Sequence, residues 1–530
     1  MARHMRPVSS PQPKPQPKGP RRAAVAVTLV LVFAAALAAA NLGGLLDRLG
    51  GAKSALLGND GTVGRSDLVL SLERSSFEVG EDGTTTFALD YAPTITSDIS
   101  IATEDGTILA TISPDGSGSQ TGTIVLDTSC PAFPQLVARA GKTSSAPVIC
   151  RMTPQVTDEM VGTLAEVATD LGEQVATRFA DDPYSEGTRE ELVSWLESDP
   201  RVEDAVVNEN CVLFRTVDGL VGGYEAAERE PDALGLGHTI EEAWQANEAG
   251  RDVSDWTIPS GKVMTNDLVR YITPIAESDG IIGNFRSSSV AELRRFATEM
   301  SYELVASESD EEGLRQMCDA SALTDCGLLA LCTHGRHVAR ASDGSRLQLF
   351  AMLMRQKDDV ETLERLNPFV EGNNVYYGSI EQPEVNDVVF TVSYDQQTKI
   401  TAFTTWMTST KLMANIGLAT FDNTIVELLV CYGTSDPQLL QFFFDHGASA
   451  VIGCHESYDC KIAISALRRL TATLASSDDS GIPRTLADVK DISFTADGGT
   501  FTAVVEIKPK FKVPTYKGLK IADKDTAVSD

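Results

Sequence analysis

The sequence predicts a multi-domain protein whose main part is an α/β sheet with flanking helices, preceded by an all-β sandwich and a small α+β linking subdomain. The chain has 530 residues, which is enough for two to four domains. Short strand-like runs separated by Gly and Asp turns fill residues 66–152, and strand-like and helical patterns alternate in residues 259–507. Alternation of strands with helices indicates βαβ units and a parallel sheet.

Composition limits the kinds of partner. The 42% hydrophobic and 22% charged residues are typical of globular protein, whereas the formal net charge of −31 is not. We expect no nucleic-acid partner, because binding to phosphates requires a basic surface. An acidic surface would instead favour basic substrates. The six histidines show no H-x-x-x-H spacing and the cysteines no C-x-x-C pair, so we predict neither a metal site nor a cofactor.

The first 46 residues predict a single membrane-spanning anchor. Residues 1–22 contain Lys and Arg but no carboxylate, and we expect them to form a disordered cytoplasmic tail. Residues 23–46 are uncharged and apolar enough to cross the bilayer as a helix, which places the bulk of the chain outside the cell. The alternative is a signal peptide cleaved near Ala38–Ala40, which would make the protein secreted. Residues 47–65 are Gly-rich and are expected to act as a tether.

Nine cysteines in an exported protein predict disulfides and at least one thiol without an intrachain partner. Three pairs are close in sequence: Cys130 with Cys150, Cys318 with Cys326, and Cys454 with Cys460. If all three were closed, Cys211, Cys332 and Cys431 would remain. We expect the odd thiol to be Cys431.

Residues 66–152 predict a β-sandwich. Strand-like runs begin at Leu68, Thr84, Ile99, Ile108 and Thr121, with turn signals between them. The run Phe77–Gly83 followed by strands resembles bacterial extracellular immunoglobulin-like modules. The resemblance implies a spacer or an adhesion module.

Residues 153–258 predict the α+β linking subdomain. Apolar residues at helical spacing indicate a helix over 158–179. Capping boxes beginning at Thr188 and Thr239 predict two more helices. Between them, residues 202–207 and 211–215 are expected to pair as a hairpin.

Two apolar runs in the main domain each end at a reactive side chain. In the stretch Leu328–Gly335 the apolar run ends at His334, and in the stretch Ile425–Gly433 it ends at Cys431. Groups at the carboxyl ends of neighbouring parallel strands point into one crevice, and a histidine beside a cysteine makes a base-assisted thiol nucleophile. The competing interpretation is that the cysteine is a core residue and that His-Gly is only a turn. A capping box at Ser435–Gln438 and a strand over 448–453 follow the cysteine.

Further residues are candidates for the surroundings of this site. Glu456 and Asp459 lie in a segment bounded by Cys454 and Cys460, where a disulfide-closed loop is expected, and could line a pocket for a basic side chain. Trp406 lies between the two reactive residues in sequence and could line the substrate groove or serve as packing. Cys332 is expected to be a core residue.

The pattern Thr333-His334-Gly335, then a strand ending at Cys431, a helix and a Gly- and Ala-containing strand over 446–453 resembles the caspase-like cysteine peptidases. This group includes gingipain, clostripain and the CHAT-type proteases. The resemblance implies a caspase-like α/β domain in which a His/Cys dyad hydrolyses peptide bonds through a thioester. It also implies that the backbone N–H groups of Gly335 and Cys431 form the oxyanion hole. Leu429-Val430 depart from the pattern, because many members have Asp or Ser with Ala before the cysteine.

Two functions follow from these patterns. The first is an extracytoplasmic cysteine endopeptidase with a protein or peptide substrate. The alternative is a non-catalytic cell-surface binding or adhesion protein with a caspase-like scaffold.

Overall fold

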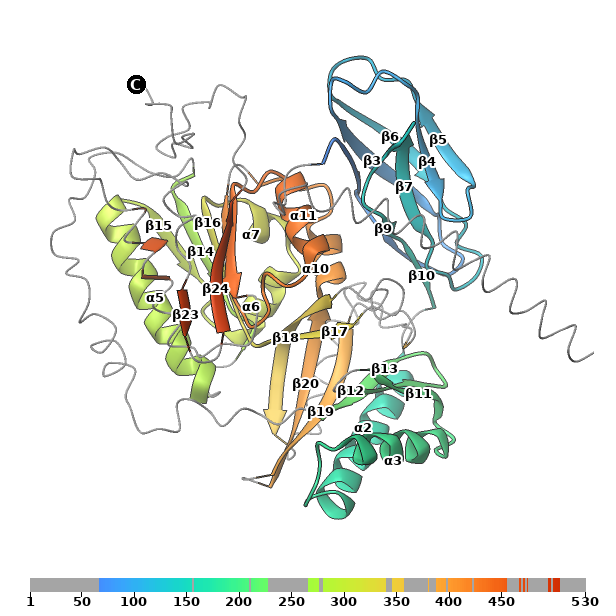
Figure 1. The fold of residues 1–530 in the computed structure, drawn as a ribbon, viewed down its shortest axis with the longest axis vertical. Helices are drawn as coiled ribbons and strands as arrows, with labels where there is room; N and C mark the ends of the chain where they lie inside the picture. Colours follow the sequence, from blue (N-terminus) through green and yellow to red (C-terminus); the bar gives the residue numbers. More distant parts are fainter. Residues whose placement is uncertain are drawn as a thin grey trace, which may run out of the picture. The chain divides into compact units, whose positions relative to one another are not determined.

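The computed structural model describes most of the chain between residues 66 and 505 (Figure 1). The described residues are 66–154, 157–208, 211–226, 266–275, 280–339, 346–356, 380, 388–396, 399–421, 424–454, 467, 468, 470, 471, 474, 494–496 and 499–505. The expected cytoplasmic tail, membrane span and tether (1–65), the cap at Thr239 and the polar tail expected over residues 508–530 lie outside them. In the described part, no helix is long and apolar enough to cross a membrane.

Short strands in residues 68–153 form a sandwich with its own core. They are β1 (Leu68–Leu72), β2 (Ser76–Glu78), β3 (Thr84–Tyr91), β4 (Ile99–Thr103), β5 (Ile108–Ile112), β6 (Ser119–Val125), β7 (Gln135–Ala140), β8 (Thr143–Ser144), β9 (Val148–Ile149) and β10 (Arg151–Thr153). One sheet has the order β1-β3-β6 and another β5-β4-β7-β8, with β9 beside β7. Side chains of β3 alternate in burial, so Phe87 and Leu89 face the core that they share with Ile99 and Ile101 of the other sheet.

Two helices and a three-stranded meander follow. They are α2 (Asp158–Arg178), α3 (Glu186–Glu197), β11 (Val202–Asn208), β12 (Cys211–Thr216) and β13 (Val221–Glu225). The Ser185 hydroxyl accepts a hydrogen bond from the Thr188 N–H, so α3 begins before the capping box predicted at Thr188. The expected hairpin is present as β11 and β12. β13 is buried along its whole length and pairs in parallel with β19, which ties this segment to a sheet built mainly from later strands.

The central sheet of the main domain is parallel over its first five strands. Its order is β15 (Glu303–Ala306), β14 (Leu268–Ile272), β16 (Leu328–Cys332), β21 (Ile425–Leu429), β22 (Ala450–Cys454), β24 (Gly499–Val505) and β23 (Phe494–Ala496). Numbered along the chain, the parallel strands have the order 2-1-3-4-5 of a doubly wound sheet. β24 is antiparallel to β22.

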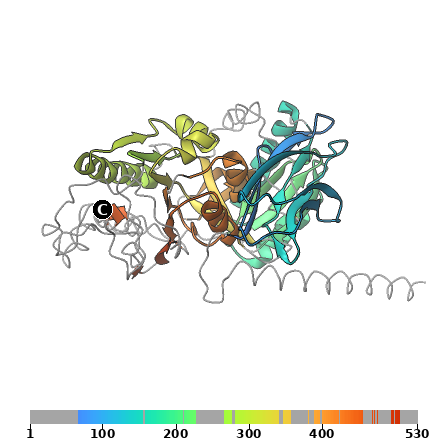
Figure 2. The ribbon, with the colours of Figure 1, turned by 90° about the horizontal axis from the view of Figure 1, so that it is seen from above.

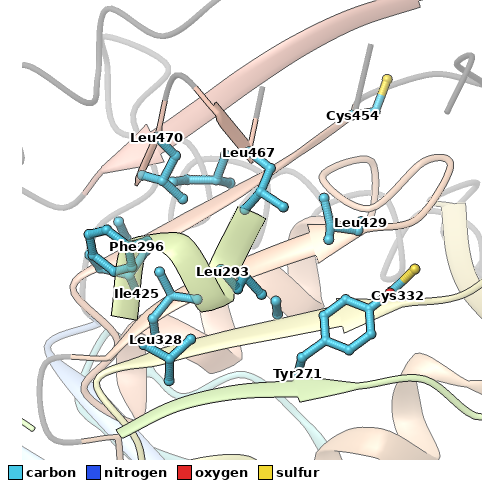
Figure 3. Close-up of a cluster of buried hydrophobic side chains, with 14 of the residues drawn as sticks. Tyr271, Leu293, Phe296, Leu328, Cys332, Ile425, Leu429, Cys454, Leu467 and Leu470 are labelled. Carbon is cyan, nitrogen blue, oxygen red and sulfur yellow. The ribbon is translucent and has the colours of Figure 1, made fainter. Parts of the chain in front are cut away.

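Helices cover both faces of this sheet, which explains why its central strands are fully buried. On one face lies α5 (Gly280–Met300), whose Leu293 and Phe296 pack over Leu328 and Ile425 (Figure 3). Figure 2 shows α5 running along the strands that it covers. The other face packs against α6 (Asp310–Met317), α7 (Ala320–Thr324), α10 (Ser409–Ile416) and α11 (Pro437–Asp445).

A second seven-stranded sheet is mainly antiparallel. Its order is β11-β12-β13-β19-β20-β18-β17, with β17 (Gly335–Ala339), β18 (Arg346–Gln356), β19 (Val388–Asp395) and β20 (Ile400–Thr408). Among the strands of this sheet that come from the main domain, the run Val388–Tyr394 has a hairpin-like pattern in the sequence. Because β16 ends at Cys332 and β17 begins at Gly335, the chain passes from one sheet into the other at His334.

Candidate active site

His334 and Cys431 follow two strands that are neighbours in the central sheet. β16 and β21 are parallel and in register, with Cys332 opposite Leu429. The Thr333 N–H donates to the Leu429 carbonyl at 3.3 Å, so the pairing extends to the carboxyl edge. His334 and Cys431 therefore each lie two residues beyond the last matched pair. Both residues are half-buried. This edge is where ligands bind in open α/β sheets.

The backbone of the His-Gly pair touches the backbone at Cys431. A Cβ atom on Gly335 would lie 2.1 Å from the Cys431 carbonyl oxygen and 2.9 Å from its nitrogen, distances that no side chain tolerates. A glycine after the histidine could leave room for a substrate carbonyl to approach the backbone. In the structure, the space beside its Cα is filled by Cys431 itself, so this close approach of the two strand ends requires glycine.

This contact predicts opposite effects for two glycine-to-alanine changes. Gly335→Ala is expected to destabilise the fold by about 1–3 kcal/mol, because the added methyl meets rigid backbone. Gly162→Ala in α2 is the matched control, since no atom lies within 4 Å of its Cβ position. It should stabilise the fold by about 0.5–1 kcal/mol. Urea denaturation checks both, and equal effects at the two positions would contradict the packing argument.

Cys431 sits in a tight turn with a strained residue after it. The Gly433 N–H donates to the Val430 carbonyl at 3.2 Å, which closes the turn. Tyr432 has a φ of 64°, in the left-handed region that costs a non-glycine residue roughly 1–2 kcal/mol. The Ser435 N–H and hydroxyl both donate to the Tyr432 carbonyl, at 2.8 and 2.7 Å. Strain of this kind is often kept where a side chain must be presented in one orientation.

α11 begins directly after this turn. Asp436 is its N-cap, because the carboxylate accepts hydrogen bonds from the N–H groups of Gln438 and Leu439. The capping box predicted to begin at Ser435 is therefore displaced by one residue. Ser435 instead stabilises the turn at Cys431.

Gln348 contacts the same turn from the second sheet. This β18 residue is fully buried, and its side-chain Nε2 donates to the carbonyls of Cys431 and Leu349, at 3.0 and 2.9 Å. Gln348 was not among the site residues predicted from the sequence. Its signal is a polar residue inside the apolar run Leu347-Gln348-Leu349-Phe350.

A positive charge lies close to the cysteine. Arg336 of β17 forms an ion pair with Glu225 of β13 and interacts electrostatically with Cys431 and Tyr432. Burial lowers the pKa of Arg336 from its usual value. Because Glu225 is buried, the pair also fixes β13 against the end of β17.

Cys332 is a core residue, as expected. It is fully buried, and burial raises the pKa of its thiol to about 12. Its sulfur lies near the Tyr271 hydroxyl, with which it interacts (Figure 3). A thiol kept neutral in this way is a poor nucleophile. Cys431, which is only half-buried, is the better candidate.

One carboxyl group is buried beneath the site. Glu427 lies on β21, four residues before Cys431, and its side chain is 0% exposed. Among the described residues, neither carboxylate oxygen has a hydrogen-bond partner. Burial, followed by the nearby charge of Glu292, raises the pKa of Glu427 to about 8. The group is therefore mostly protonated at neutral pH.

The remaining predicted site residues have different positions. Trp406 is 3% exposed, and its indole N–H donates to the Thr391 hydroxyl at 2.7 Å. It packs in the core with residues such as Leu349, so its ring is enclosed and does not line an open groove. Glu456 and Asp459 lie outside the described residues.

Two of the predicted disulfides are not formed. Cys150 and Cys326 are buried thiols, and burial raises the pKa of each to about 12. Cys130, in contrast, is exposed on the surface of the sandwich while Cys150 is in its core, which separates the two sulfurs. The third predicted pair joins Cys454 to Cys460, which lies outside the described residues.

In the described part of the chain, no group of three or more His, Cys, Asp or Glu side chains is arranged to hold a metal ion. Comparison with family models, with curated proteins and with solved structures finds no match for this chain.

Proposed function

We propose that this protein is a cysteine endopeptidase of the caspase-like type that acts outside the cytoplasm. The observation that supports it best is the register of β16 and β21, which brings His334 and Cys431 to the same edge of adjacent strands. The proposed reaction needs only these two side chains and two backbone N–H groups. No step requires a cofactor.

In the proposed mechanism, the Cys431 sulfur attacks the scissile carbonyl while its proton passes to the His334 imidazole. The N–H groups of Gly335 and Cys431 hold the oxyanion. The imidazolium then gives its proton to the leaving amine, which departs as the thioester forms. Water activated by His334 hydrolyses the thioester and regenerates the thiol.

Two features support this assignment of roles. The contact between Gly335 and the backbone at Cys431 holds the two strand ends against each other. The guanidinium of Arg336 interacts with Cys431, and a nearby positive charge favours the thiolate form of a cysteine. The substrate is a protein or peptide. Within this proposal, Glu456 and Asp459 form a pocket for a basic side chain of the substrate.

The N-terminal segment supports a location at the cell surface. The basic residues 1–22 followed by an uncharged apolar stretch are typical of a single-pass anchor, with the sandwich and the main domain outside. Cleavage within the Ala-rich segment would release the same domains. Immunoblotting of membrane and medium fractions distinguishes the two.

The test of the peptidase proposal is covalent labelling with a peptide that carries an electrophilic acyloxymethyl ketone. We expect the label on Cys431 in a peptide digest, and Cys431→Ala should abolish both labelling and cleavage of a peptide library. Cys318→Ala is the matched control, because Cys318 is also partly accessible but lies at the end of α6. Cleavage that survives Cys431→Ala would refute the proposal.

One observation favours the alternative of a non-catalytic binding protein. The edge strands β5 and β6 of the sandwich carry Ile108 and Val125, which are 63% and 65% exposed. An unpaired edge strand with an exposed apolar side chain can pair with a strand of another protein. Absence of labelling at Cys431 together with ligand binding that is lost in Ile108→Lys would support this function.

A further inference from the structure

The turn that carries Cys431 depends on the orientation of one peptide group. Cys431 and Tyr432 are its second and third residues, and of the two only Tyr432 has a positive φ. This combination defines a type II turn, in which the peptide between the two central residues is flipped relative to a type I turn. The third position usually holds glycine or asparagine. A tyrosine there needs a compensating interaction.

The side chain of Gln348 provides that interaction. One terminal atom of its side-chain amide lies within hydrogen-bond distance of two carbonyl oxygens, those of Cys431 and Leu349. Carbonyls only accept hydrogen bonds, so the NH₂ group must face them and the amide oxygen must point away. That oxygen is buried and has no hydrogen-bond partner among the described residues. The orientation of the amide is therefore determined by its two donated bonds, one of which ends on the flipped peptide.

Gln348 is itself held in place. Its backbone N–H donates to Asp436 Oδ2 at 3.2 Å, and the same oxygen accepts a hydrogen bond from the Ser409 hydroxyl at 2.6 Å. The other oxygen of Asp436 caps α11. Because Asp436 and Gln348 are both 0% exposed, these bonds are shielded from water. They connect β18, α10 and α11 to the turn at Cys431.

We propose that Gln348 is a positioning residue that holds the Cys431–Tyr432 peptide in its flipped orientation and so directs the Cys431 thiol towards His334. The inference rests on the proposed function only for the role of Cys431 as nucleophile. Gln348 does not touch the reacting atoms. Without it, Tyr432 would relax to a negative φ, and the turn would present the cysteine differently.

The experiment measures the alkylation rate of Cys431 by iodoacetamide, read from its own peptide by mass spectrometry, alongside peptide cleavage. Gln348→Met keeps the length of the side chain but cannot donate hydrogen bonds, and we expect the alkylation rate and kcat/KM each to fall about tenfold. Adding Tyr432→Gly should restore both, because glycine adopts the left-handed conformation without cost. If Gln348 served only as packing, Tyr432→Gly would not restore the rates lost in Gln348→Met.

Two outcomes would overturn the proposal: an unchanged alkylation rate in Gln348→Met, or a reduced rate that Tyr432→Gly does not restore. If Gln348→Met does not fold, Gln348→Asn replaces it, since its shorter amide cannot reach the Cys431 carbonyl and the same loss and rescue are expected. The alkylation rate is independent of peptide cleavage. A failed peptidase proposal would therefore appear as no cleavage in any variant, while the rates still test Gln348.

Discussion

Glu427→Gln is expected to stabilise the protein strongly at pH 9 and hardly at all at pH 5. In the folded protein, burial raises the pKa of Glu427 from 4.5 to about 8. Between these two values the folded state holds a proton that the unfolded chain releases. The contribution of this proton to the free energy of unfolding is therefore fully present below about pH 4.5, and it is lost as the pH rises through about 8. At about 1.4 kcal/mol for each pKa unit, the loss reaches at most about 5 kcal/mol.

The measurement is urea denaturation of Glu427→Gln and of the unchanged protein at pH 5 and pH 9. The glutamine is neutral at every pH, so the gain in free energy of unfolding over the unchanged protein should be larger at pH 9 than at pH 5. Glu303→Gln is the matched control, because Glu303 is exposed on β15 of the same sheet and should show no such trend. An equal effect of Glu427→Gln at the two pH values would show that the carboxyl group does not change its ionisation on folding.

The position of Glu427 connects this stability to the candidate site. It shares β21 with the residues that lead to Cys431, and its neighbours across the sheet are Ala330 and Ile452. Ionisation at high pH would place a charge on the α5 face, opposite Glu292. That charge would destabilise β21, the strand that leads to Cys431. Loss of activity above pH 8 would follow unfolding and not the titration of the reacting groups.

The sequence predicted the central sheet better than the second sheet, for a physical reason. Strands buried on both faces are continuous apolar runs, so β16 and β21 are visible as Leu328–Cys332 and Ile425–Leu429. β20 is rich in threonine, and β13 pairs with β19 across more than 160 residues of chain. Local patterns contain no information on such pairing, and the linking segment was therefore expected to form a subdomain of its own.

In the candidate site too, some features are visible in the local sequence and others depend on contacts between distant segments. His334 and Cys431 could be proposed as candidates because reactive residues at strand ends are visible in the sequence. The left-handed conformation of Tyr432 could not, because it depends on the contacts of Gln348 and Ser435 with the turn. Gln348 and Glu427 did leave a signal, since each is a polar residue within an apolar run. A buried polar residue next to a reactive strand end is a useful pointer to groups that support a site.

His334→Gln is expected to lower peptide cleavage strongly without loss of folding. Removing a general base typically lowers the rate by about 10² to 10⁴. Because His334 is half-buried at the junction of two strands and glutamine is of similar size, the melting temperature should change little. Peptide cleavage by His334→Gln should therefore be slower by a factor in this range. Labelling of Cys431 by the acyloxymethyl ketone should also slow, because no imidazole is present to accept the thiol proton.

His337→Gln provides the matched control, since it changes another histidine three residues further along the chain, on β17. Cleavage by this variant should be close to that of the unchanged protein. If both variants lost activity equally, the effect would come from the fold of β17 and not from proton transfer. If His334→Gln kept full activity, the base would have to be another group. The shared edge of β16 and β21 would then be a structural feature, and Cys431 would need a different partner.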